Sequence, residues 1–136
     1  MAESDSDLEL IKQGFENMES QGWEKALLPL LAEDFEFTTP PGMATEPDTY
    51  RGKEGLRRYF ESFYEVMEEI HFKPHGFRRV GEWIVVPCTL TARGRATGLE
   101  ADQDAVLAWK LRDGKAVRIE VFPSLEDALG ALDPGG

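Results

Sequence analysis

Few residues in this sequence could do acid–base chemistry. Asp34 stands between a helical stretch and a strand-like stretch, where a carboxylate at the mouth of a pocket could act as a general base. The same carboxylate could instead cap a turn or pair with a basic side chain. Tyr50 and Tyr59 could offer a phenol to a ligand, although a tyrosine at a helix edge often only packs. The catalytic residue is unknown from the sequence, with these three side chains as candidates.

The histidines and the cysteine do not form a recognisable centre. His71 and His75 are four residues apart, but Pro74 prevents the helix that would place both rings on one face. The single cysteine, Cys88, lies among apolar strand residues and is expected to pack as a small core or interface residue. Because no activated serine or cysteine stands near a histidine, nucleophilic catalysis is not expected.

Three carboxylates alternate along one predicted strand. Glu100, Asp102 and Asp104 would share one face of that strand. Such a row could hold a divalent cation, but it is more typical of a solvated edge or of partners for Arg93 and Arg95. We therefore expect neither a metal nor another cofactor.

Length and charge narrow the class of protein. The chain has 136 residues and a formal charge of −11, of which −10 falls within residues 1–50. An acidic surface repels phosphate groups, so we expect no nucleic-acid partner and no membrane association. The apolar runs are too short to span a bilayer, and the N-terminus lacks the features of a signal peptide. A cytoplasmic location is the expectation.

Apolar spacing predicts the elements that must position these residues. A period of 3.6 residues indicates helices, and a two-residue alternation indicates strands. Pro29 should bend or end the second helix, and Asp113-Gly114 should form a hairpin turn. Helices are predicted at 6–21, 23–31, 52–70 and 125–132, and strands at 34–39, 71–80, 83–95, 99–112 and 115–122.

This order predicts one α+β domain over residues 1–136, with frayed ends at 1–5 and 133–136. Helices that are segregated from a run of strands cover one face of a curved sheet. We expect a cone-shaped, curved antiparallel (mixed) sheet wrapped by three N-terminal helices, with a short C-terminal helix. Such a cone encloses a pocket.

Three stretches of the sequence are familiar together: LLAEDFEFTTPPG at 30–42, YRGKEGLRRYFESF at 50–63 and AVLAWKLRDGKAVRIEVF at 105–122. They resemble the SnoaL-like group of the nuclear transport factor 2-like superfamily, and the predicted element order matches that fold over essentially the whole chain. The fold hosts isomerases, cyclases, epoxide hydrolases and non-enzymatic adaptors. The resemblance therefore implies the fold but not one activity.

The resemblance also implies catalytic positions, which this chain fills with other residues. The general base of ketosteroid isomerase matches Thr39, and its two oxyanion-hole donors match Phe15 and Leu107. The catalytic aspartate of the SnoaL cyclase matches Val121, and its supporting histidine again matches Leu107. None of these side chains can move a proton as those mechanisms require.

Alternation from the matched positions predicts a pocket lined by aromatic and aliphatic side chains. Such a lining favours a flat apolar guest, which threonines and the indole N–H of Trp109 could orient. A core filled by the same side chains is the alternative. The predicted ligand-binding residues are Phe15, Phe37, Thr39, Phe60, Phe63, Val85, Pro87, Thr89, Leu107, Trp109, Ile119 and Val121.

The opposite face of the predicted sheet is also apolar, which would leave an exposed patch in water. The family that the sequence resembles pairs two subunits through this face, so a homodimer is expected. A monomer covered by its own C-terminal tail is the alternative. The residues that alternate away from the predicted pocket are Ile84, Val86, Cys88, Leu90, Val106 and Ala108.

Two kinds of function fit these patterns. One is a non-catalytic pocket that binds a small, neutral or cationic apolar molecule, since an acidic rim disfavours anions. The other is an isomerase, cyclase or hydrolase acting on a small hydrophobic carbonyl or polycyclic compound through non-standard residues. The absence of an acid or base at every matched position favours binding over catalysis, and a purely structural interaction module is a third hypothesis.

Overall fold

The computed structural model describes residues 5–38 and 49–132. The helices in these ranges are α1 (Asp5–Gln21), α2 (Trp23–Leu27), the 3-10 helix η2 (Leu28–Leu30), α3 (Gly52–Val66) and α4 (Leu125–Leu132). The strands are β1 (Leu31–Thr38), β2 (Thr49–Arg51), β3 (Met67–Pro74), β4 (Arg78–Val80), β5 (Trp83–Gly94), β6 (Glu100–Arg112) and β7 (Lys115–Phe122). No helix in these ranges is long and apolar enough to cross a membrane.

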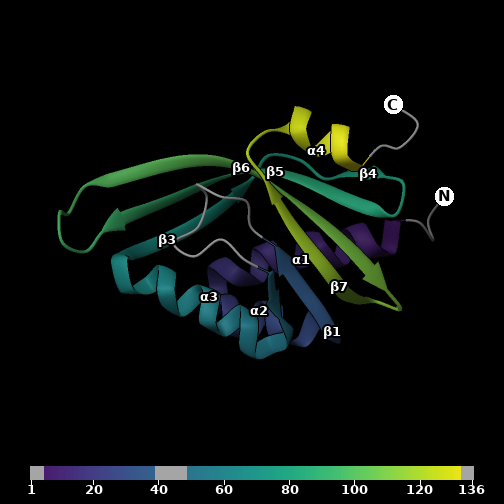
Figure 1. The fold of residues 1–136 in the computed structure, drawn as a ribbon, viewed down its shortest axis with the longest axis horizontal. Coiled ribbons are helices and arrows are strands. Elements are labelled where there is room, and N and C mark those ends of the chain that lie inside the picture. The colour runs from purple at the N-terminus through teal and green to yellow at the C-terminus, as the bar shows by residue number, and fades with distance from the viewer. Residues whose placement is uncertain (1–4, 39–48, 133–136) are drawn as a thin grey trace.

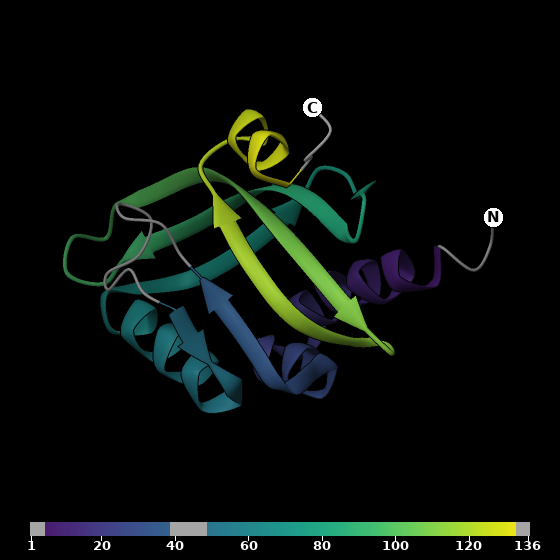
Figure 2. The same ribbon diagram turned by 45° about the vertical axis from the view of Figure 1, so that its right-hand side comes forward.

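The strands form one mixed sheet in the order β2-β1-β7-β6-β5-β3, with β4 beside β5. Strand β1 runs parallel to β7, and the other recorded pairs are antiparallel. Helices α1, α2 and α3 lie on one side of the curved sheet and α4 lies on the other, as Figures 1 and 2 show. The predicted α+β fold, a curved mixed sheet with three N-terminal helices and a short C-terminal helix, is confirmed.

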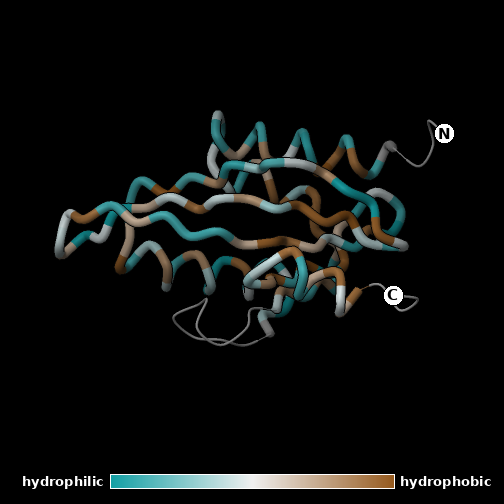
Figure 3. Tube along the Cα trace, turned by 90° about the horizontal axis from the view of Figure 1, so that it is seen from above, coloured by the Kyte–Doolittle hydropathy of each residue, from teal (hydrophilic) through white to brown (hydrophobic). Residues whose placement is uncertain are grey.

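The main core fills the space between the three N-terminal helices and the sheet. Ile11 and Phe15 of α1 are four residues apart, as are Leu56 and Phe60 of α3, so each pair lies on one helical face. Figure 3 shows the same segregation, with hydrophilic positions turned outward along α1 and hydrophobic ones turned toward the sheet. Phe35 of β1 is a fully buried member of this cluster.

A second, smaller core lies on the opposite face of the sheet, beneath α4. Val85 of β5, Val106 of β6 and Ala128 of α4 are its buried members. Trp83, Phe122 and other partly buried side chains pack around them. The middle of β5 is therefore buried on both of its faces.

Two local features fix how the elements join. Asp113 and Gly114 both have positive φ angles, of 54° and 78°, as a two-residue type I′ hairpin turn requires. The predicted turn between β6 and β7 is thus confirmed. At Gly55, a Cβ atom would come 2.9 Å from the carbonyl carbon of Tyr50, so only glycine lets the first turn of α3 approach β2 this closely.

The helix predicted at 52–70 is too long. Helix α3 ends at Val66, and Met67 already pairs with Gly94 of β5. The apolar residues that extended the helical pattern belong to β3, which carries a bulge between Glu68 and His71. Pairing with β5 supplies hydrogen bonds that the sequence pattern does not reveal, and it overrides the local helical period. Strands β2 and β4 have three residues each, too few for a visible alternation.

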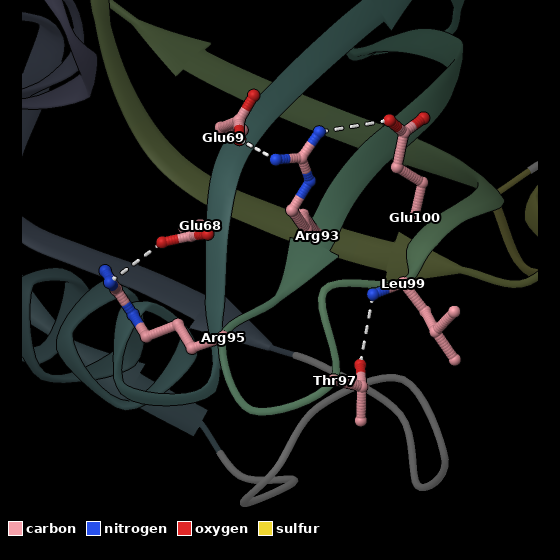
Figure 4. A network of polar contacts seen from close by, with 7 residues as sticks. All are labelled: Glu68, Glu69, Arg93, Arg95, Thr97, Leu99 and Glu100. Atoms are coloured by element: carbon pink, nitrogen blue, oxygen red, sulfur yellow. Dashed lines mark hydrogen bonds and ion pairs between the residues drawn. The ribbon is translucent and has the colours of Figure 1, made fainter.

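Ion pairs hold the bulge of β3 against the far end of β5 and β6 (Figure 4). Arg93 lies between Glu69, at 2.9 Å, and Glu100, at 3.2 Å. Arg95 pairs with Glu68 at 3.3 Å and donates a hydrogen bond to the carbonyl oxygen of Tyr64. Of the three carboxylates predicted to alternate on β6, Glu100 therefore pairs with Arg93, whereas the partner of Arg95 comes from β3.

The contact between α4 and the sheet gives a first test. Ala128 is fully buried against β5 and β6, so Ala128→Leu should overpack the site and destabilise the protein by about 1–3 kcal/mol. The matched change Ala131→Leu, at an exposed position of the same helix, should stay within about 0.5 kcal/mol of the parent. Urea unfolding measures both. Equal effects would mean that α4 does not pack as described.

Candidate ligand-binding cavity

A cavity of about 60 Å³ lies between the N-terminal helices and the inner face of the sheet. The sheet contributes residues of β1, β3, β5, β6 and β7. From α1, α2 and α3 come Phe15, Met18, Leu27, Leu56, Tyr59 and Phe60. The cavity thus lies within the main core, enclosed by the elements that the helical stripes and strand pairing bring together.

Aromatic rings give the cavity wall its shape. Phe15 meets Trp109 edge to face, with ring centroids 6.0 Å apart. Tyr59 contacts Phe37 at 4.7 Å and Phe60 at 5.3 Å. Tilted and edge-to-face pairs of this kind are favourable packing arrangements, and they fix the orientation of each ring.

Within residues 5–38 and 49–132, the cavity lining includes no Asp, Glu, His, Lys or Arg side chain. The polar groups are the phenol of Tyr59, the thiol of Cys88, the amide of Gln103 and the indole N–H of Trp109. The wall can therefore donate or accept a few hydrogen bonds, but it offers no charge to a guest.

Burial decides the protonation of the two titratable groups in the wall. Desolvation raises the pKa of Tyr59 to about 12, with a smaller contribution from the neighbouring Tyr50 phenol. Desolvation likewise raises the pKa of Cys88 to about 12, and the nearby Asp104 carboxylate adds to the effect. At neutral pH Tyr59 is a neutral hydroxyl and Cys88 an unreactive thiol.

A family model for the SnoaL-like domain matches residues 11–119, which is more than half of the chain. The chain belongs to the SnoaL-like family. The resemblance carried by the three sequence stretches is confirmed. No curated protein matches the chain with significance.

Solved structures with this fold include three that show its range. An NTF2-like protein of unknown function from Burkholderia pseudomallei shares 22% identity over 93% of this chain and 96% of that chain, with a TM-score of 0.77. TerC, co-crystallised with polyporic acid, shares 25% identity over 93% and 96% of the two chains, with a TM-score of 0.76. A Catenulispora acidiphila protein with a ketosteroid isomerase-like fold, in complex with trimethylamine, shares 14% identity over 91% and 92%, with a TM-score of 0.71.

Seven of the residues predicted for the pocket of this SnoaL-like domain line the cavity. They include Phe15, Leu107 and Val121, which match the family's catalytic positions and carry no acid or base. Thr39, the fourth matched position, lies outside the described residues. The seven are Phe15, Phe37, Phe60, Leu107, Trp109, Ile119 and Val121.

The face predicted for β5 is wrong. Val85 belongs to the second core under α4, and Pro87 and Thr89 share its side of the strand. The residues on the other side face the main core, where Cys88 and Leu90 line the cavity. Residues 83–90 are apolar on both faces, so alternation alone cannot choose between them. The pairing with β6 decides: Ile84 lies opposite Trp109 and Val86 opposite Leu107, and directly opposed residues share a face.

This correction also removes four of the six residues on which the homodimer prediction rested, whereas Val106 and Ala108 of β6 do lie on the outer face of the sheet. Ile84 and Val86 are buried in the main core, and Cys88 and Leu90 line the cavity. Helix α4 of the same chain covers the outer face around Val85. Self-association stays a prediction. Phe63, also predicted to bind the guest, does not line the cavity, although its ring lies 6.2 Å from that of Tyr59.

Of the three catalytic candidates, Tyr59 lines the cavity and the other two do not. Asp34 forms an exposed ion pair with Arg112 at 3.0 Å, and this hydrogen bond lowers its pKa. Tyr50 is buried behind the wall, where its ring packs near Tyr59 and under the guanidinium of Arg58 at 4.8 Å. Asp34 therefore pairs with a basic side chain, which is one of the alternatives to a general base that the sequence left open.

The two histidines have separate partners. His71 Nδ1 lies 3.2 Å from the Glu19 carboxylate, and His75 Nε2 lies 2.6 Å from Thr89 Oγ1. Thr89 donates in turn to Asp104 at 2.8 Å. The part of the chain that the structure describes contains no cluster of three or more His, Cys, Asp or Glu that could hold a metal ion.

Sequence reasoning missed lining residues from several elements. Cys88, Leu90 and Ala105 follow from the strand register, which sequence alone does not provide. Met18 and Leu27 could have been found, because both lie on apolar helical faces. They are ordinary core residues by type, and nothing local distinguishes a cavity wall from a filled core.

Burial of Tyr59 predicts an alkaline limit to stability. The stability contributed by a phenol whose pKa rises from 10.0 to about 12 is fully present below pH 10 and is lost as pH rises toward 12. Tyr59→Phe should therefore reduce the fall in the free energy of unfolding between pH 10 and 12, which urea unfolding at several pH values measures. At pH 8 the slope of stability with pH should match that of the parent. Parallel curves throughout would show that the phenol ionises normally.

Proposed function

We propose that this SnoaL-like domain binds a small neutral apolar molecule in its cavity without transforming it. The observation that supports this most directly is the lining. Hydrocarbon and aromatic side chains form most of the described wall, together with two groups that stay protonated at neutral pH. Pockets of this composition bind through apolar contact and use their few polar groups for orientation.

Charge favours a neutral guest. A buried carboxylate is costly unless a cation or several hydrogen bonds compensate it, and the described lining offers no Lys, Arg or His. The formal charge of −11 on the whole chain also repels anions at a distance. A neutral molecule meets neither penalty.

Size limits the guest further. A cavity of about 60 Å³ is smaller than the roughly 150 Å³ that accepts benzene in an engineered apolar cavity. A guest of a few heavy atoms is the best match to this volume. A ring system would require side chains to move, and the flexible thioether of Met18 is the lining residue best suited to do so.

Similarity to TerC gives independent support for ligand binding. TerC was co-crystallised with polyporic acid and shares 25% identity over 93% of this chain. A protein similar to this chain has thus been crystallised together with a small organic molecule. We carry over only this class of partner, because one fold supports many ligands.

Catalysis by Tyr59 is a second candidate function. Its phenol lines the cavity and stays protonated, so it could act as a general acid toward a bound carbonyl. Enolisation also requires a base that removes a proton from carbon. Since the described wall has no carboxylate or imidazole, binding is the better supported function.

A matched pair of probes tests the proposed function. 2-Butanone and propionate have the same number of heavy atoms. A methyl group on the carbonyl carbon of 2-butanone is replaced by a charged oxygen in propionate. 2-Butanone should cause saturable NMR shifts in amides around the cavity, with a dissociation constant on the order of 1 mM. Propionate should bind at least about tenfold more weakly, because it must bury its charge. Equal or tighter binding of propionate would contradict a neutral site.

Two alanines of the same strand localise the binding. Ala105 lines the cavity, whereas Ala101, on the same face of β6, does not. Ala105→Leu should fill the cavity and abolish the 2-butanone shifts, and Ala101→Leu should keep them. Incubation of 2-butanone in D₂O separates binding from catalysis: acceleration of α-proton exchange that Tyr59→Phe abolishes would establish the enzyme instead.

A further inference from the structure

Trp109 carries a hydrogen-bond donor that the fold leaves unused. Its indole Nε1 is buried and has no hydrogen-bond partner among the described residues. The whole residue is 3% exposed, so solvent does not satisfy the N–H either. A buried donor without a partner has lost its water and gained nothing in return, so such atoms are rare in folded proteins.

The side chains around Trp109 cannot accept this hydrogen bond. On the inner face of the sheet, Trp109 lies between Ile84 of β5 and Ile119 of β7, and Phe15 of α1 meets its ring edge to face. These neighbours are hydrocarbon. The backbone carbonyls of the flanking strands lie within the sheet, where they serve the ladder.

Two other buried atoms without a partner differ from this one. Arg93 Nε and Arg118 Nε belong to guanidinium groups whose terminal nitrogens form ion pairs with Glu100 and Glu120 at the surface. Indole has a single donor and no alternative nitrogen. Trp109 also lines the cavity, which the two arginines do not.

We propose that the guest of this cavity carries a neutral acceptor oxygen, such as the carbonyl of a small ketone, which accepts a hydrogen bond from Nε1–H of Trp109. This inference rests on the proposed binding function and adds the chemical class of the ligand. The apolar body of such a molecule contacts Phe15, Ile119 and the other hydrocarbon of the wall. Its oxygen provides the partner that the fold does not.

A second donor suits the same class of guest. Tyr59 lines the cavity, and because burial raises its pKa to about 12, its hydroxyl keeps its proton under all ordinary conditions. A water molecule would need two to four polar partners to be held. A wall composed mostly of hydrocarbon favours an apolar molecule with one acceptor over water.

An isosteric pair of probes tests the hydrogen bond. 2-Butanone and 2-methyl-1-butene have the same shape, with a carbonyl oxygen replaced by a methylene group. Trp109→Phe removes the N–H and keeps an aromatic ring. We expect this change to weaken binding of the ketone by about fivefold to tenfold relative to its effect on the alkene. Because both probes experience the same change in cavity size, the ratio isolates the hydrogen bond.

The indole signal of the unaltered protein provides a measurement that does not depend on the folding of a variant. The chain has three tryptophans, and Trp23→Phe and Trp83→Phe assign the other two indole N–H resonances. Saturation with 2-butanone should move the Trp109 indole proton downfield, as hydrogen bonding does, and the alkene should not.

The outcomes separate this inference from the proposed function. If both probes bind the cavity but Trp109→Phe weakens them equally and the indole signal does not respond to the ketone, the acceptor proposal is overturned and apolar binding stands. If neither probe binds, the proposed function fails with it.

Discussion

The pairing of β5 with β6 is the constraint on which the rest of the structure depends. It runs from Trp83 opposite Lys110 to Arg93 opposite Glu100, and it places Ile84 and Val86 beside Trp109 and Leu107. A register shift of one residue would turn every side chain of β5 to the other face. The cavity wall, the second core and the ion pairs at the far end of the sheet all follow from this one alignment.

Burial of β5 on both faces explains how a strongly acidic chain can enclose a cavity whose described lining carries no charged side chain. The helices α1 to α3 cover one face and α4 covers the other, and the acidic side chains of the described residues lie outside both cores. Asp34 and Glu19 illustrate this, because each is exposed and pairs with a basic group or a histidine at the surface. The charge of the chain thus affects which molecules approach, while the composition of the wall affects which can be held.

Membership of the SnoaL-like family leaves the chemistry of this chain open, and the wall restricts it. Three of the four positions that match the acids and bases of the family's enzymes hold Phe15, Leu107 and Val121, and these side chains line the cavity. The fourth, Thr39, lies outside the described residues. The polar groups of the described lining residues are a protonated phenol, an indole N–H, a thiol and an amide. Such groups orient a neutral molecule well and transfer protons poorly, which is why we propose binding rather than turnover.

The sequence by itself determined the order of the helices and the longer strands, the helical stripes and the Asp113-Gly114 turn, because these depend on local periodicity and backbone preference. Together with the positions matched to the family, alternation also placed Leu107 and Trp109 of β6 and Ile119 and Val121 of β7 on the inner face. Only the tertiary structure decided the face of β5, the end of α3 at Val66 and the unpaired state of the Trp109 indole. Each of these depends on a partner distant in sequence, and where both faces of a strand are apolar no local pattern can specify it.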